Sequence, residues 1–91
     1  MSDWSTADAL EAERRYTNRL PLTMRQTAHV LNLTFLRGAK KGQPDRRQVL
    51  ERIADGRLHV IDASVKEPYW TISAQELDRY QTGTARLQVA L

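Results

Sequence analysis

The pattern of apolar and polar positions predicts a short amphipathic helix within the stretch from Asp45 to Leu58. At 100° per residue, four side chains share one apolar arc: Val49, Leu50, Ile53 and Ala54. The opposite arc is polar and carries Gln48, Glu51, Arg52 and Asp55, with Arg47 on its flank. Asp45 is placed to cap the first turn, and Gly56 follows the last apolar position, where helices commonly end. We therefore expect one face to pack and the other to meet a partner.

Two helices are predicted upstream of this stretch. Ser5 is placed to cap a helix that runs to about Asn18, and the weak apolar stripe of this helix suits a cover over one side of the core. A dimerisation or partner-binding arm is the alternative. Thr23 and Gln26 have the spacing of a capping box, in which each side chain satisfies the other residue's backbone donor, so a second helix begins at Met24.

The connection from residue 34 to residue 44 interrupts this periodicity with two glycines, a proline and three basic residues. It predicts a loop, with one turn of helix at Thr34–Arg37. Asn32, just before it, tolerates the left-handed backbone that turns a chain out of a helix. The basic residues of the loop are suited to a phosphate backbone, and a solvated insertion is the alternative.

After Gly56 the apolar positions recur with a period of two. Apolar and polar residues alternate in residues 57–60 and again in residues 69–72, on either side of a polar, turn-like stretch. This pattern predicts a two-stranded hairpin. Trp70 and Ile72 share one face and should pack on the helices rather than serve as a stacking platform. The capping spacing recurs in residues 73–76 and predicts a last helix over residues 74–81 that stops before Gly83. Residues 84–91 form a tail that is either frayed or an interaction segment.

The distribution of charge along the chain indicates which kind of partner it could bind. The chain has 91 residues and a formal net charge of +3, which allows one domain with a modest core. Seven of its 14 basic residues fall between Arg37 and Arg57. A basic cluster of this kind attracts polyanions, of which nucleic acid is the commonest, although an ordinary solvated face carries similar charge.

The absence of certain residues excludes several kinds of chemistry. There is no cysteine, and His29 and His59 lie on different predicted elements without an acidic cluster, so we expect no disulfide and no metal site. No Ser-His-acid set, Gly-rich phosphate loop or convergent carboxylate pair is present, so we expect no enzyme activity, no catalytic residue and no cofactor. No apolar run approaches the roughly 18 residues of a membrane span, and a signal-peptide core is missing. We therefore expect a cytoplasmic protein without a membrane partner.

The predicted elements follow the order of a winged helix-turn-helix: helix, turn, basic helix, hairpin and closing helix. Residues 22–80 resemble the excisionase-like, MerR-type winged helix-turn-helix domains of phage and plasmid regulators. The resemblance rests on LT…TA…VL in residues 22–31, RRQVL…IADGRL in residues 46–58 and YWTIS…EL…Y in residues 69–80. Two features depart from the family pattern: the turn at residues 34–44 is long, and Tyr69 and Thr71 stand where basic residues often flank the strand tryptophan.

The element order and the resemblance together predict a mainly α fold with a small β-hairpin, in which residues 22–83 form a winged helix-turn-helix. Residues 1–21 are then an N-terminal helical extension and residues 84–91 a C-terminal tail. The resemblance also implies a phage-encoded or bacterial protein of the nucleoid that binds and bends double-stranded DNA, self-associates on it, and helps a tyrosine-type integrase to excise a prophage, as recombination directionality factors do. A small MerR-like transcriptional regulator, either repressor or activator, is the alternative. A protein-interaction module on the same fold is a third.

The basic helix supplies the predicted base contacts, which are Arg47, Gln48 and Arg52, because arginine pairs with guanine and glutamine with adenine in the major groove. Glu51 would accept from cytosine or orient Arg52. Phosphate contacts are expected from Arg46, Thr23, Arg25, Lys40 and Lys41, and the wing contact from Lys66. For each of these residues a solvated surface position is the alternative.

Overall fold

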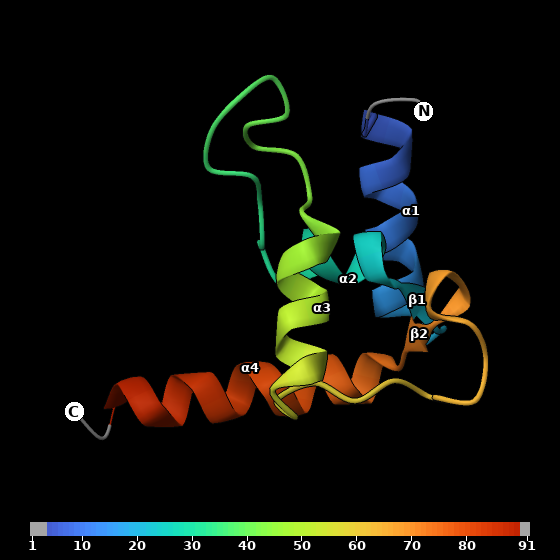
Figure 1. The fold of residues 1–91 in the computed structure, drawn as a ribbon, viewed down its shortest axis with the longest axis vertical. Coiled ribbons are helices and arrows are strands. Elements are labelled where there is room, and N and C mark those ends of the chain that lie inside the picture. Colours follow the sequence, from blue (N-terminus) through green and yellow to red (C-terminus); the bar gives the residue numbers. More distant parts are fainter. Residues whose placement is uncertain (1–3, 90–91) are drawn as a thin grey trace.

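The computed structural model describes residues 4–89, and the side chains of residues 4–83. It contains the helices α1 (Thr6–Thr17), α2 (Met24–Val30), α3 (Arg46–Ala54) and α4 (Ala74–Val89). Helix α1 packs against α2, α2 packs against α3, and α4 crosses below them (Figure 1). The fold is therefore mainly helical, as the sequence predicts. Within the described residues, no helix combines the length and apolar character needed to cross a membrane.

The helix starts are set by local hydrogen bonds. At α1 the Asp8 amide donates to Ser5 Oγ at 3.1 Å, and the Ser5 amide donates to Asp8 Oδ2 at 2.9 Å. The backbone hydrogen bond from Ser5 holds the pKa of Asp8 below its usual value. Thr23 and Gln26 make the same reciprocal pair at α2, with bonds of 2.9 and 3.1 Å. Both predicted starts are confirmed, because a capping box needs only residues three apart.

The last helix is longer than predicted. The Glu76 amide donates to Ser73 Oγ at 3.1 Å, which confirms the start. The predicted stop before Gly83 is wrong, since α4 continues through this glycine to Val89. A glycine inside a helix costs about 1 kcal/mol relative to alanine but keeps its amide donor. The C-terminal tail is thus partly helical, and residues 90 and 91 lie outside the described part.

The sheet has two short antiparallel strands, β1 (Leu22–Thr23) and β2 (Thr71–Ile72), with Leu22 opposite Ile72. The prediction of a small β-element that contains residues 71–72 is confirmed, but its pairing with residues 57–60 is wrong. Leu22 and Ile72 are both fully buried, so the pairing brings two apolar side chains into the core. Residues 57–61 form no strand, although the Ile61 amide donates to the Thr71 carbonyl at 2.9 Å. A 3₁₀ turn at Glu67–Tyr69 leads into β2.

The core lies where α2, α3, α4 and the sheet meet. Its fully buried large side chains are Leu22, Thr27, Val49, Leu58, Ile72 and Leu77. Leu50, Ile53 and Trp70 pack against this cluster partly buried, whereas Ala54 at the end of α3 is exposed. Trp70 is therefore a packing residue, as predicted, and its indole N–H donates to the Val65 carbonyl at 3.0 Å.

The loop between α2 and α3 is an ordered ribbon rather than a helical turn. Thr34 and Pro44 form an antiparallel bridge, the Phe35 amide donates to the Gln43 carbonyl at 3.0 Å, and the Gly42 amide donates to the Phe35 carbonyl at 3.0 Å. The predicted turn of helix at Thr34–Arg37 is wrong, because these bonds run across the loop and hold its first residues extended. Asn32 has a φ of 58°, which confirms the left-handed exit from α2. The loop projects beyond the N-terminal end of α3 (Figure 1).

Candidate nucleic-acid interface

Helix α3 is fixed from its apolar side and leaves its polar side outward. Val49 is fully buried in the core, and Asp45 caps the first turn by accepting from the Arg47 amide at 3.0 Å. Asp45 is only 5% exposed. At the other end Gly56 has a φ of 78°, in the left-handed region where glycine carries no steric penalty. Both predicted end signals of this helix are confirmed.

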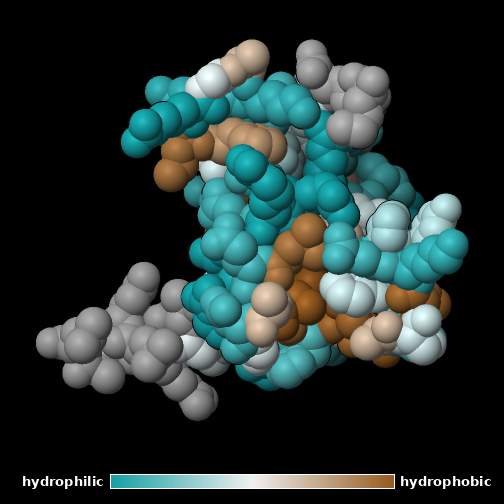
Figure 2. All heavy atoms as spheres, viewed as in Figure 1, coloured by the Kyte–Doolittle hydropathy of each residue, from teal (hydrophilic) through white to brown (hydrophobic). Residues whose placement is uncertain are grey.

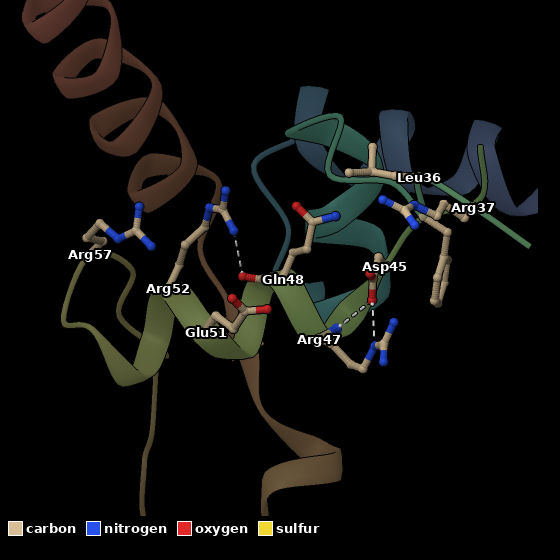
Figure 3. A pocket seen from close by; sticks show the side chains of 9 residues that line it. Leu36, Arg37, Asp45, Arg47, Gln48, Glu51, Arg52 and Arg57 are labelled. Carbon is tan, nitrogen blue, oxygen red and sulfur yellow. Dashed lines mark hydrogen bonds and ion pairs between the residues drawn. The ribbon is translucent and has the colours of Figure 1, made fainter. Parts of the chain in front are cut away.

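A groove of about 520 Å³ runs between α3 and the loop (Figure 3). It is lined by Phe35, Leu36, Arg37, Asp45, Arg47, Gln48, Glu51, Arg52 and Arg57. Four of these side chains are arginines and two are carboxylates, one of which is the buried cap of the helix. Figure 2 shows mainly hydrophilic residues over the loop and the adjoining side of α3, with hydrophobic residues at the inner edge of the loop and toward the sheet. The groove therefore offers net positive charge at a concave surface.

Arg47 lies over an aromatic ring in this groove. Its side chain is 72% exposed, its Nε lies 3.4 Å from Asp45 Oδ1, and its guanidinium carbon lies 5.3 Å from the centre of the Phe35 ring. Lys40 Nζ lies 5.9 Å from the centre of the same ring. A smaller hollow of about 120 Å³ adjoins Phe35 and is lined by Arg25, Phe35, Lys40, Pro44 and Arg46. Phe35 thus lines both hollows and has cations near its ring.

Gln48 and Arg52 are held inside the protein more than their helical positions suggest. Gln48 Nε2 donates to the Thr34 carbonyl at 2.7 Å and ties α3 to the loop. Arg52 Nε donates to the Tyr80 hydroxyl at 2.8 Å and its Nη1 donates to the Gln48 carbonyl at 2.9 Å. Both line the groove, but their polar groups brace neighbouring elements. Of the three predicted base contacts, Arg47 is the most exposed.

The predicted phosphate contacts occupy several places around α3. Arg25 lies beside the smaller hollow, with its guanidinium 5.2 Å from the centre of the Trp4 ring. Arg46 is exposed, and its Nη2 lies 3.7 Å from Glu67 Oε1. Lys40 and Lys41 are exposed on the loop. The Thr23 hydroxyl accepts from the Gln26 amide in the α2 cap. The structure brings Arg25, Lys40 and Arg46 together in one hollow.

Lys66 lies apart from the groove, on the exposed stretch that precedes the 3₁₀ turn. This stretch begins at an anchor on α4, where the His59 amide donates to Glu76 Oε2 at 2.8 Å. Hydrogen bonds from the Arg79 guanidinium, and then the one from His59, hold the pKa of Glu76 below its usual value. Residues 57–59 are fixed to α4 in this way, next to the C-terminal end of α3.

Five residues of the groove were not among the named contacts: Phe35, Leu36, Arg37, Asp45 and Arg57, of which Asp45 was predicted only as the helix cap. Arg37 was predicted only as one of the loop's basic residues, and Arg57 only as part of the basic cluster. Their position depends on how the loop and the chain after Gly56 fold back on α3, and helical periodicity carries no information on this. An apolar Phe-Leu pair beside an arginine in an otherwise polar loop was the available signal.

No three His, Asp or Glu side chains come together as a metal site in the part of the chain that the structure describes. Comparisons with protein-family models, with curated proteins and with solved structures found no match to this chain. The geometry of the groove and the chemistry of its side chains are therefore the basis for a functional argument.

Proposed function

We propose that this chain binds duplex DNA with sequence preference, using α3 and the adjoining groove, in the manner of a winged helix-turn-helix protein. The order of α2, loop, α3, an irregular stretch and β2 supports this proposal, since it holds one helix outward beside a second element. A groove that carries four arginines at an exposed helix face is the observation that favours it most. Clustered guanidinium groups pair with phosphates and with guanine edges.

The proposed biological role is the architectural one suggested by the resemblance to excisionases. In it the protein bends DNA, assembles in several copies and promotes prophage excision by a tyrosine-type integrase. A small MerR-like transcriptional regulator would use the same surface. A protein-interaction role has one observation in its favour, because Ile61, Val65 and Tyr69 expose apolar surface on the stretch after α3.

In vitro selection of duplex DNA from a random pool, at near-physiological salt, tests DNA binding directly. Closely spaced direct repeats are expected for cooperative architectural assembly, and an inverted repeat for a dimeric regulator. No enrichment by a protein shown to be folded would contradict DNA binding and favour the protein-interaction role.

Two arginines of the same exposure provide a matched test of the surface. Arg57 at the groove and Arg14 on α1 are each 52% exposed, and each is paired with a carboxylate at 2.8 Å. Arg57→Gln should weaken DNA binding and reduce the slope of log K against log salt by about 0.9 if one phosphate contact is lost. Arg14→Gln should change neither. Equal effects from both variants would contradict the proposed surface.

A further inference from the structure

The two stretches that flank α3 differ in charge. The loop of residues 34–44 contains Arg37, Lys40 and Lys41 and no acidic residue. The stretch from residue 59 to residue 70 contains Lys66 between Asp62 and Glu67. A phosphate-bearing partner is attracted to the first stretch and not to the second. The loop, rather than the stretch after α3, is therefore the second element suited to contact DNA.

The loop is fixed to α3 by several contacts. The Asp45 amide donates to the Leu33 carbonyl at 2.8 Å at the base of the loop. The Gln48 side chain binds the Thr34 carbonyl at 2.7 Å, and Arg47 lies over Phe35. Since these contacts come from the first turn of α3, the helix and the loop form one unit with a set spacing.

Leu36 occupies an unusual position in this unit. It is 78% exposed, although it lines the groove and has Arg37 as its neighbour in the sequence. Figure 3 shows Leu36 and Arg37 on the loop side of the groove, across from the polar face of α3. In the major groove of DNA, the thymine methyl is the apolar group that an aliphatic side chain meets.

We propose that the loop is a second DNA-reading element, in which Leu36 contacts a thymine methyl beside the bases read by α3 and Arg37 contacts a phosphate there. This inference rests on the proposed function. It adds a specificity-determining residue outside the recognition helix. The polar group of Gln48, in contrast, holds the loop against α3, and that of Arg52 ties α3 to α4.

Replacing thymine by uracil removes the methyl group and leaves base pairing intact, which gives a direct test. The duplex recovered by selection is prepared with uracil in place of thymine at each position in turn. The native protein should bind one uracil duplex about fourfold more weakly, the effect of one buried methyl group. Leu36→Ala should bind the thymine and uracil forms of that duplex equally.

Leu10 on α1 is 61% exposed and does not line the groove, so Leu10→Ala is the matched control and should keep the fourfold preference. Arg37→Gln should reduce the salt slope by about 0.9. If Leu36→Ala keeps the preference for thymine, or if the native protein shows none, the loop proposal is overturned while DNA binding stands. If the native protein selects no duplex, the proposed function fails, and the loop proposal fails with it.

Discussion

Thr27 on α2 has a buried hydroxyl whose replacement should stabilise the protein. The residue is fully buried, and its Oγ1 has no hydrogen-bond partner among the residues that the structure describes. A buried polar group without a partner costs about 1–3 kcal/mol. Thr27→Val keeps the branched shape and exchanges the hydroxyl for a methyl group. We expect it to raise the free energy of unfolding by about 1 kcal/mol, at the lower end of that range.

Urea titration and thermal unfolding followed by circular dichroism measure this change. For a domain of this size, 1 kcal/mol corresponds to a rise in Tm of roughly 4–8 °C. Thr27→Ser is the control, because it keeps the hydroxyl and loses the methyl group, and it should destabilise by about 1 kcal/mol. If Thr27→Val is no more stable than the native protein while Thr27→Ser is less stable, the hydroxyl has a partner and the reasoning is refuted. The proposed binding of DNA should be the same in Thr27→Val, since α3 and the groove are unchanged.

Tyr80→Phe removes the acceptor of Arg52 Nε, and it should lower the free energy of unfolding by about 0.5–1.5 kcal/mol in urea titration; an unchanged value would show that this bond does not brace α4. The hydrogen bond from Tyr16 lowers the pKa of Asp78, so its stabilising effect is present at neutral pH and is lost as pH falls below about 4. Asp78→Asn should therefore be less stable than the native protein at pH 7 and equal to it in strong acid, and a gap that persists at low pH would contradict this assignment. Gly56→Ala places a side chain at a φ of 78° in open space, and should cost about 1–2 kcal/mol through backbone strain alone. A loss above about 3 kcal/mol would indicate a contact instead.

Local signals predicted the helix starts because their partners lie within one turn. Ser5, Thr23 and Asp45 each cap a helix as expected, and Asn32 and Gly56 each adopt the left-handed backbone. The side-chain and backbone groups involved lie at most three positions apart, so the chain between them has little freedom to rearrange.

Long-range partners were not predictable in this way. The alternation within residues 57–60 is typical of a strand, but it is Leu22 that pairs with Ile72. No local pattern shows which of these two segments pairs with the strand at residues 71–72. The same holds for the interface. The helical angle placed Gln48 and Arg52 correctly on the polar face. Whether their polar groups face solvent depends on the positions of Thr34 and Tyr80, which the rest of the fold determines.

The bracing of residues 34–44 has a consequence for the affinity and the lifetime of the proposed complex. A loop that must become ordered on a ligand loses conformational entropy at that moment, and the loss weakens binding. Here the bridge between Thr34 and Pro44 and the bond from Gln48 already hold the loop, so most of this entropy is lost during folding. Gln48→Ala would transfer part of that loss to the binding step and shorten the lifetime of the complex, even though Gln48 itself need not contact the ligand.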